Sequence, residues 1–545
     1  MIDVLLAHSY FLAFDPKQTQ KMRPYPPLAT LYAASQLRVA GYEVALFDAM
    51  LAAGEHEFAT ALEQHRPRLV ALYEDNFNFL SKMCLTRMRE AACTMVGMAR
   101  EHGALVVVSG ADVSDRPELY LRRGAHAALV GEPDHTLREV VALLDDRRPT
   151  TDDSRSDSSG GRPSSREVVA LLDDRRPTTD DSRGDSSGGH RSSVVGRLQQ
   201  IPGLVLLDPS APDGLRYTAR RPVERQPDMF PTPAWDLVEI ERYRAAWQGA
   251  HGYFSLNMVS TRGCPFHCNW CAKPIWGQRY AMRSPASVAE ELAMLKRTYS
   301  PDHIWFTDDI FGLRPQWVAA FGREVAARDA AVPFMIQSRA DLMSDEAVEG
   351  LRQAGCVEVW MGAESGSQQV LDAMDKGITV AEIRAARERL RQAGIRACFF
   401  IQFGYPGESF DDILATVELV RTALPDNIGV SVSYPLPGTK FHTLVREQLG
   451  QKTNWTDSGD LAMIFQGTYG SPFYRHLHRL LHRELELRQA LATGNTAGLA
   501  NELALLTADW LKLGQFEATE RSATPTVISK DYLRLAAPDL SKEYN

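Results

Sequence analysis

Three cysteines lie close together in the chain, and their spacing points to iron chemistry. Cys264, Cys268 and Cys271 follow the pattern C-x3-C-x2-C in the segment TRGCPFHCNWCAKPIWGQRY, residues 261–280. Three thiolates on one loop can hold three irons of a [4Fe–4S] cube and leave the fourth iron open to a non-protein ligand. An open iron suits inner-sphere chemistry, whereas a cluster that only transfers electrons usually has four protein thiolates. We therefore predict a [4Fe–4S] cluster bound by these cysteines.

A structural zinc site is the alternative use of this loop. His267 together with the three cysteines would complete a Cys3His tetrahedron. His267 adjoins Cys268, however, so one short loop would have to turn both side chains toward the same ion. The cluster is therefore the favoured interpretation. The zinc site is the second, and three unrelated buried cysteines are the third.

The chain has seven cysteines, an odd and sparse number for 545 residues. This is not the framework of a disulfide-rich secreted protein, so we expect a reducing compartment. The first residues, MIDVLLAHSYFLAFD, lack a positively charged leader and a cleavage site. No apolar run approaches the roughly 18 residues that span a bilayer. We expect a cytoplasmic protein with no membrane span.

Charge and length limit the other possibilities. The net charge is −9 and no block of Lys or Arg forms a basic face, so we expect no nucleic-acid partner. At roughly 150 residues per domain, the length suggests three or four units.

The first 145 residues alternate short apolar runs with helical patterns. Strands are predicted at 3–7, 43–47, 69–73, 105–109 and 127–130. Strands alternating with helices indicate a parallel, doubly wound sheet of the flavodoxin or Rossmann type. Such sheets bind ligands at the carboxyl ends of their strands. Those ends lie near His8, Asp48, Glu74, Gly110 and Gly131.

A second strand–helix series begins near residue 253. Six strands are predicted, at 254–260, 303–307, 333–337, 357–362, 397–403 and 427–434. Six units in about 190 residues suggest a partial (β/α)6 barrel. After Phe441 the pattern becomes mainly helical. One amphipathic helix, residues 473–488, carries His476, His478 and His482. A solvated helix face that covers the substrate cavity is favoured for them over a metal site.

These patterns give an α/β chain with five segments. Residues 138–165 recur almost verbatim as 166–193, and their polar, Gly- and Ser-rich parts are typical of disorder. The predicted segments are a sheet domain at 1–145, a disordered duplicated linker at 146–193, a connection at 194–249, a barrel at 250–445 and a helical region at 446–545.

The cysteine segment resembles the signature of the radical S-adenosylmethionine (radical SAM) superfamily, C-x3-C-x-Φ-C with an aromatic Φ, which here is Trp270. IWFTDDIFG, QSRAD, MGAESGS, FGYPGES and YPLPGTKF resemble the motifs that follow later barrel strands. In the family, SAM chelates the open iron and is cleaved reductively to a 5′-deoxyadenosyl radical. The resemblance implies SAM contacts from Trp270, Asp308, Asp309, Arg339, Glu364, Ser365, Gly404 and Gly407. Asp308 is favoured for the SAM ammonium group, with a helix N-cap as its alternative.

Residues 23–49, 106–118 and 124–137 resemble the cobalamin-binding domain of a radical SAM subgroup. That subgroup includes the anaerobic magnesium-protoporphyrin monomethyl ester cyclase and P-methylases. The resemblance implies cobalamin contacts from His8, Ser9, Asp48, Glu74, Ser109, Gly110, Gly131 and Glu132. The D-x-H-x-x-G motif of several other cobalamin proteins is absent, so no cobalt ligand is assigned, and a solvated loop residue is the favoured interpretation of His8.

The resemblance implies an enzyme with three cofactors: a [4Fe–4S] cluster, SAM and cobalamin. Methylation of an unactivated carbon or phosphorus of a small molecule is the favoured reaction. An oxidative cyclase or ring-rearranging enzyme is the second hypothesis, and a non-catalytic cobalamin or redox sensor is the third. A low-potential donor such as flavodoxin or ferredoxin would supply the electron. The motifs identify neither the substrate nor the catalytic residues.

Overall fold

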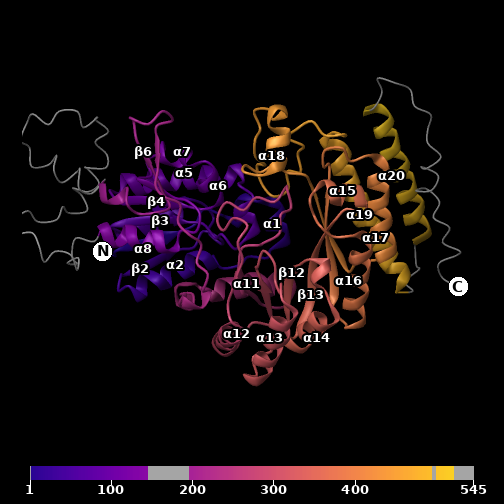
Figure 1. Cartoon of the computed structure of the whole chain (residues 1–545), viewed down its shortest axis with the longest axis horizontal. Coiled ribbons are helices and arrows are strands. Elements are labelled where there is room, and N and C mark those ends of the chain that lie inside the picture. The colour runs from indigo at the N-terminus through magenta and orange to yellow at the C-terminus, as the bar shows by residue number, and fades with distance from the viewer. Residues whose placement is uncertain (1, 145–195, 494–498, 521–545) are drawn as a thin grey trace, which may run out of the picture.

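The computed structural model describes residues 2–144, 196–493 and 499–520 (Figure 1). The repeated segment that we predicted to be a disordered linker lies outside the described residues from 145 to 193. No helix in the described ranges is long and apolar enough to cross a membrane.

The N-terminal sheet has the strand order β2-β1-β3-β4-β5-β6-β7. Its first five strands are parallel, and the order β2-β1-β3-β4-β5 is the flavodoxin-like one. β1, β3 and β4 are apolar and fully buried because helices cover both faces. The predicted doubly wound sheet is confirmed. Its parallel strands are β1 (Val4–Ala7), β2 (Val44–Phe47), β3 (Leu69–Tyr73), β4 (Leu105–Ser109) and β5 (Ala127–Leu129).

Two further strands come from the segment predicted to be a connection. β6 (Leu204–Leu207) pairs antiparallel with β5, and β7 (Leu215–Tyr217) pairs antiparallel with β6. The apolar run LVLL supplies a buried edge for β5. Part of the chain between 194 and 249 therefore belongs to the first sheet.

The second sheet has the order β15-β14-β13-β12-β11-β8, and all its pairs are parallel. Each strand pairs with the next strand of the series, as in a (β/α) barrel, and the two outer strands do not close on each other. The predicted partial barrel is confirmed. Its strands are β8 (Ser255–Met258), β11 (His303–Phe306), β12 (Phe334–Ser338), β13 (Cys356–Glu364), β14 (Arg396–Phe403) and β15 (Asn427–Val432).

Helices cover both sheets, and the last two lie beside the barrel (Figure 1). The N-terminal helices are α1 (Pro16–Lys21), α2 (Leu28–Val39), α3 (His56–His65), α4 (Phe79–Lys82), α5 (Thr86–Glu101), α6 (Ala111–Asp115), α7 (Pro117–Leu121) and α8 (Asp134–Leu144). The later ones are α11 (Ile240–His251), α12 (Pro285–Tyr299), α13 (Pro315–Ala327), α14 (Asp345–Ala354), α15 (Gln368–Ala373), α16 (Val380–Gln392), α17 (Phe410–Ala423), α18 (Lys440–Val445), α19 (Ser471–Ala492) and α20 (Leu499–Glu520).

The two sheets share one hydrophobic core. Apolar residues of the first sheet and of the barrel belong to the same buried cluster. Polar contacts at the seam fix the register: Tyr25 Oη lies 3.1 Å from Ser255 Oγ, and Asn257 Nδ2 donates to the Pro26 carbonyl at 3.0 Å. The segment 24–26 therefore holds the first barrel strand against the N-terminal domain.

Gly350 gives a test of the packing between α13 and α14. A Cβ there would lie 2.9 Å from Ala319 N and 3.0 Å from its Cα, both backbone atoms. A methyl group there would force the backbones of the two helices apart. Gly350→Ala is therefore expected to destabilise the protein by about 1–3 kcal/mol. Thermal or urea unfolding measures the change.

Gly249→Ala is the matched control. This glycine lies within α11 and its Cβ would meet nothing within 4 Å. Alanine favours a helix over glycine by up to about 1 kcal/mol, so this variant should be neutral or more stable. Equal stability of the two variants would contradict the close packing of α13 on α14.

Candidate functional site

The carboxyl ends of the two parallel sheets face each other, and their loops are in contact. Phe77, after β3, stacks on Trp276 of the cysteine segment with ring centroids 5.2 Å apart. Lys82 of α4 pairs with Asp309, which follows β11. Tyr434, after β15, accepts a hydrogen bond from Asn454 and stacks on Trp455. The candidate site therefore lies where both folds place their ligands.

A two-stranded hairpin holds the cysteine loop at its base. β9 (Thr261–Arg262) pairs antiparallel with β10 (Ala281–Met282). Between them, Gly263 has φ +79°, and a Cβ there would lie 2.4 Å from the Arg279 carbonyl oxygen. Only glycine fits this turn, which starts the loop one residue before Cys264.

The three cysteines are free, half-buried and close enough to interact. Burial raises the pKa of the Cys271 thiol to about 12, and Cys264 and Cys268 contribute to the rise. Burial also raises the pKa of Cys264, while Lys273 opposes this. Lys273 donates to the Phe266 carbonyl across the loop. Bound iron would supply the positive charge that turns these thiols into thiolates.

The donor set fits a cube better than a single ion. Within the described residues, no three Cys, His, Asp or Glu side chains converge as ligands of one metal ion would. In a [4Fe–4S] cube each thiolate binds a different iron, so the three sulfurs stand apart. A cube therefore does not need the convergence on one ion that a Cys3His zinc site would need.

Two cations lie against Cys268. Arg339 follows β12, and its Nη1 is 3.9 Å from Cys268 Sγ while its guanidinium lies 3.8 Å from the Phe266 ring centre. Lys376 is buried in an ion pair with Glu364 at 2.7 Å, and Cys268 is among the groups that raise its pKa against the effect of burial. Two cationic groups, each paired with a carboxylate, therefore lie near this sulfur.

Glu364 ends β13 in a strained conformation. Its φ is +59°, which is unfavourable for a residue with a side chain. The register with β14 shifts between Gly362 and Glu364. A Cβ at Gly362 would lie 2.5 Å from both Glu364 Oε1 and Lys376 Nζ, so glycine leaves the room that this ion pair occupies.

The two aspartates after β11 have different partners. Asp308 is buried and accepts hydrogen bonds from Ser260 N at 3.0 Å and from Thr261 Oγ1 at 2.5 Å. Burial raises its pKa to about 7, although these donors oppose the shift. Asp308 thus ties the end of β11 to the start of the loop that carries the cysteines, while Asp309 binds Lys82.

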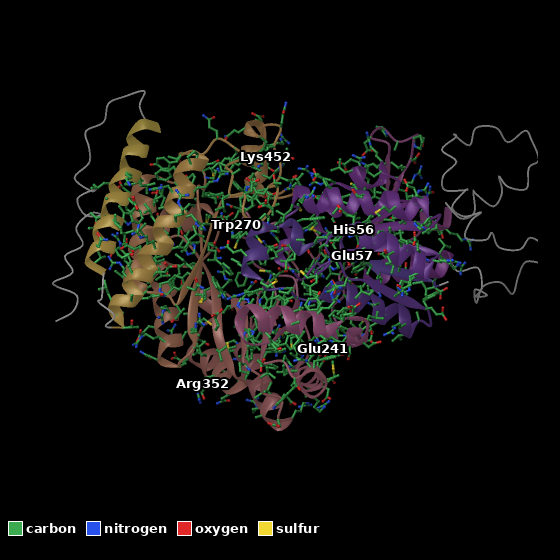
Figure 2. The ribbon with its side chains drawn as sticks, turned by 180° about the vertical axis from the view of Figure 1, so that it is seen from behind. His56, Glu57, Glu241, Trp270, Arg352 and Lys452 are labelled. Carbon is green, nitrogen blue, oxygen red and sulfur yellow. The ribbon has the colours of Figure 1, made fainter. Side chains whose placement is uncertain are left out.

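The remaining residues predicted to contact SAM lie around the ends of β13 and β14. Ser365 is buried and its Oγ lies 3.0 Å from Thr416 Oγ1. Gly404 and Gly407 have φ +77° and +87° in the turn after β14. Trp270 packs on a small apolar cluster that includes Tyr405 and Phe441. Figure 2 shows it beside the ends of the barrel strands, and its buried Nε1 has no partner among the described residues.

At the edge of the first sheet, His8 and Asp48 form a buried pair. His8 Nε2 lies 2.9 Å from Asp48 Oδ1, and Tyr243 donates to Asp48 Oδ2 at 2.6 Å. Asp48 and the more distant acids raise the pKa of His8, although burial opposes the rise. His8 is only 1% exposed, so the interpretation of a solvated loop histidine is wrong.

Glu74, after β3, holds together the loops that follow β1 and β4. Its carboxylate accepts hydrogen bonds from Ser9 N at 3.1 Å and from Ser9 Oγ at 2.6 Å. Gly110, with φ +152°, packs on the Glu74 side chain, and a Cβ there would be 2.9 Å away. Further along this edge, buried oxygens of Asp75, Asn76 and Ser109 have no partner among the described residues. Such orphaned oxygens fit the amide-rich rim of a corrin.

Arg262 joins the two edges. It is 3% exposed, and its Nη1 donates to Glu132 at 2.6 Å and to Asp134 at 2.9 Å. Glu132 also accepts from Trp276 Nε1 at 3.3 Å. The Phe230 ring lies 3.7 Å from the guanidinium carbon. One buried cation therefore connects the base of the cysteine loop to the loop after β5.

Family profiles match both halves of the chain: the B12 binding domain over residues 23–141 and the radical SAM superfamily over residues 258–420. The chain contains a B12-binding domain followed by a radical SAM domain. This confirms both resemblances and gives the chain its three cofactors: a [4Fe–4S] cluster, SAM and cobalamin.

Curated relatives match about half of this chain. An uncharacterized methyltransferase of Pyrococcus horikoshii is 26% identical over 259 residues, 47% of this chain and 55% of the relative. The anaerobic magnesium-protoporphyrin IX monomethyl ester cyclase of Rubrivivax gelatinosus is 28% identical, over 46% of this chain and 44% of the relative. The chain thus spans about half the length of these relatives.

Solved structures share the fold. The cobalamin-dependent SAM radical enzyme OxsB has a TM-score of 0.66 at 14% identity, covering 98% of this chain and 82% of that one. The radical SAM methyltransferase TsrM of Kitasatospora setae has a TM-score of 0.58 at 19% identity, covering 82% and 78%. At these identities the likeness concerns the fold alone.

Several residues at the site carry no short motif and were not predicted. They are Asp75, Asn76, Lys82, Arg262, Lys273 and Lys376. Arg262 is the one with a usable signal, because it lies next to the cysteine signature and must have a counter-ion if it is buried. Its partners are about 130 residues away, and the sequence does not indicate that separation.

Replacing any one of Cys264, Cys268 and Cys271 by alanine should abolish the cluster. Iron per chain, measured after anaerobic reconstitution, is expected to fall from about four to near zero. Cys93→Ala is the control, because this half-buried thiol lies on α5. Retention of the cluster in the Cys268→Ala chain would exclude the three-thiolate assignment.

Arg262→Met should leave Glu132 and Asp134 buried without their cation. Removing one partner of a buried ion pair costs about 3–5 kcal/mol, so the unfolding transition should move down strongly. Burial raises the pKa of Glu132 even beside the arginine, which opposes the rise, so its removal should raise that pKa further. The folded variant then binds more protons than its unfolded chain does. Its loss of stability relative to the unaltered chain should therefore shrink as the pH falls toward 5.

The triple variant Arg262→Met, Glu132→Gln, Asp134→Asn is the control for this charge effect. It removes the buried charges together, so it should recover stability and lose the pH dependence. A deficit in Arg262→Met that stays constant between pH 8 and pH 5 would contradict the role of the pair.

Proposed function

We propose that this chain is a cobalamin-dependent radical SAM enzyme that methylates an unactivated carbon or phosphorus of a small molecule. The observation that carries the proposal is the apposition of the two carboxyl edges through Arg262. It brings the cysteine loop next to the loops that bind cobalamin in such sheets. A radical made at one edge and a methyl group carried at the other can then meet one substrate.

Bound together, the cluster and SAM supply a 5′-deoxyadenosyl radical, and cobalamin supplies a carrier for the methyl group. The chain's own residues would hold SAM in position and shield the site from water. Trp270 and the turn at Gly404 and Gly407 would take the adenine end of SAM, and Arg339 would stand beside its carboxylate. Asp308 would hold the strand ends in place, in addition to any contact with the SAM ammonium group.

On the cobalamin side, the orphaned oxygens of Asp75, Asn76 and Ser109 are the best candidates for contacts to the corrin amides. Ser9, Glu74 and Gly110 would support them, because they hold neighbouring loops together. His8 and Asp48 bind each other and would position the first loop. Gly131 and Glu132 would face the cysteine segment.

An oxidative cyclase is the second candidate, supported by the relatedness to the Rubrivivax cyclase. The cyclase and methyltransferase hypotheses share the radical step and differ in what happens to SAM and cobalamin afterwards. The electron would come from a low-potential donor such as flavodoxin or ferredoxin.

Incubating the reconstituted full chain with SAM and dithionite under anaerobic conditions tests the proposal. We expect 5′-deoxyadenosine and methionine from cleavage, and S-adenosylhomocysteine when cobalamin is also bound. The products are separated and quantified by liquid chromatography. The Cys268→Ala chain is the control, and it should form neither nucleoside.

The product pattern distinguishes the hypotheses. Deoxyadenosine without S-adenosylhomocysteine, in chains that hold cobalamin, would reject methyl transfer and favour the cyclase. The absence of both products in a chain with an intact cluster would reject an enzyme and favour a sensor.

A further inference from the structure

Four basic side chains of α1 and α19 lie close enough to interact electrostatically, outside the cofactor site described above. Lys17 and Lys21 stand one turn apart on α1, and His478 and His482 stand one turn apart on α19. The two imidazole rings are 4.6 Å apart between centroids. Burial lowers the pKa of each imidazole to about 4, and both lysines add to the shift. We call these four residues the basic cluster.

The position of α1 is fixed by the loop before α19. Asp15 accepts hydrogen bonds from Ser458 N at 3.1 Å and from Ser458 Oγ at 2.9 Å. Lys17 Nζ donates to the Ser458 carbonyl at 3.2 Å, and Gln18 Nε2 donates to Ser458 Oγ at 2.9 Å. These contacts, which span 440 or more residues of sequence, hold α1 and Lys17 against the loop before α19.

Among the described residues, no acid forms an ion pair with the basic cluster. In the described part of the chain, Lys21, His478 and His482 form no ion pair, and neither imidazole forms a hydrogen bond. The acids near Lys17 are Asp15 and Asp457. Asp15 is occupied by Ser458, and Asp457 accepts from the amide of Gly459. Lys17 and the two imidazoles are partly buried, Lys21 is exposed, and these basic groups disfavour one another's charged forms. A bound anion would offset that repulsion.

The basic cluster is adjacent to the cofactor site. Tyr474 lies one turn before His478 on α19. Its ring reaches the carboxyl end of β14, since a Cβ at Gly404 would lie 3.2 Å from Tyr474 Cζ. Each helical turn advances about 5.4 Å, so the two histidines follow about one and two turns from this contact. An extended small molecule could bind at both places.

We propose that Lys17, Lys21, His478 and His482 bind an anionic group, a carboxylate or a phosphate, of the substrate. This rests on the proposed function in one respect only, that the bound anion belongs to the molecule that reacts at the cofactor site. The lysines supply charge and the neutral imidazoles supply N–H donors. The substrate class is therefore an acidic metabolite whose reacting atom lies several bonds from its charged end.

A metal ion between the histidines is the competing use of this pair. The i,i+4 spacing suits it, but two imidazoles provide only two ligands and no carboxylate joins them. Two lysines on the facing helix would repel a cation. An anion therefore accounts for all four residues, and a metal accounts for only two.

The probes are inorganic phosphate and succinate, titrated into the full chain with its cluster oxidised and cobalamin bound. Histidines labelled with carbon-13 at Cε1 report binding by NMR, and the signals of His478 and His482 are assigned with H478Q and H482Q. We expect one or both anions to shift these two signals and to raise the pKa of both imidazoles, because a bound anion favours the charged form. The anion that binds tighter identifies the class.

Three variants test the lysines. K17M/K21M should weaken binding by roughly tenfold or more for each charge removed. K17R/K21R keeps the charge and should bind. K296M is the matched control, because Lys296 lies on α12 and pairs with Asp329. The iron content of each variant shows that the chain has kept its cluster, and if K17M/K21M fails this check, H478Q/H482Q tests the opposite helix.

The proposal is overturned if neither anion shifts the two signals, and a shift with zinc alone would favour the metal site. It is also overturned if K17M/K21M binds the anion as tightly as K296M does. Deoxyadenosine formation is measured separately on the unaltered chain. Anion binding without SAM cleavage would reject the proposed function alone, and SAM cleavage without anion binding would reject the basic cluster alone.

Discussion

The arrangement of this protein depends on one buried ion pair network, in which Arg262 lies between Glu132 and Asp134. A guanidinium removed from water needs full compensation, which two carboxylates and the Phe230 ring provide, while Trp276 donates to Glu132. These partners belong to the loop after β5, the cysteine loop and the chain between the domains. Because the network is satisfied in only one relative position, it sets how the cysteine loop meets the first sheet. Together with the shared hydrophobic core, the network holds the two domains at one separation.

The surroundings of the cysteine loop follow from that constraint. Arg339 and Lys376 concentrate positive charge beside Cys268, and Lys273 lies beside the other two cysteines. Such charges would stabilise added electrons on a bound cluster. The strained Glu364 persists because Gly362 leaves space for its ion pair. Strain and buried charge are thus placed at the strand ends, and the strands themselves are ordinary apolar core.

Local sequence patterns predicted the strands and turns well, because these elements depend mainly on residues that are neighbours in the sequence. Apolar runs of four to six residues marked the strands of both sheets, and glycines marked the turns after them. The role of residues 204–217 was not predicted, because antiparallel addition to β5 depends on which edge is free. His8 was misinterpreted for a similar reason: a polar residue after a strand looks solvated until its partner Asp48, forty residues away, closes over it.

The sequence alone determined the chemistry that starts at the three cysteines, since the spacing of the thiols in one loop decides how many irons they hold. It also determined both sheets and the loops that would bind their cofactors. The tertiary structure decided how the two edges meet, because Arg262 and its acids are about 130 residues apart and pair only after both domains have folded. It likewise brought α1 close to α19. The basic residues of these two helices are more than 450 positions apart in the sequence and interact only in the folded chain.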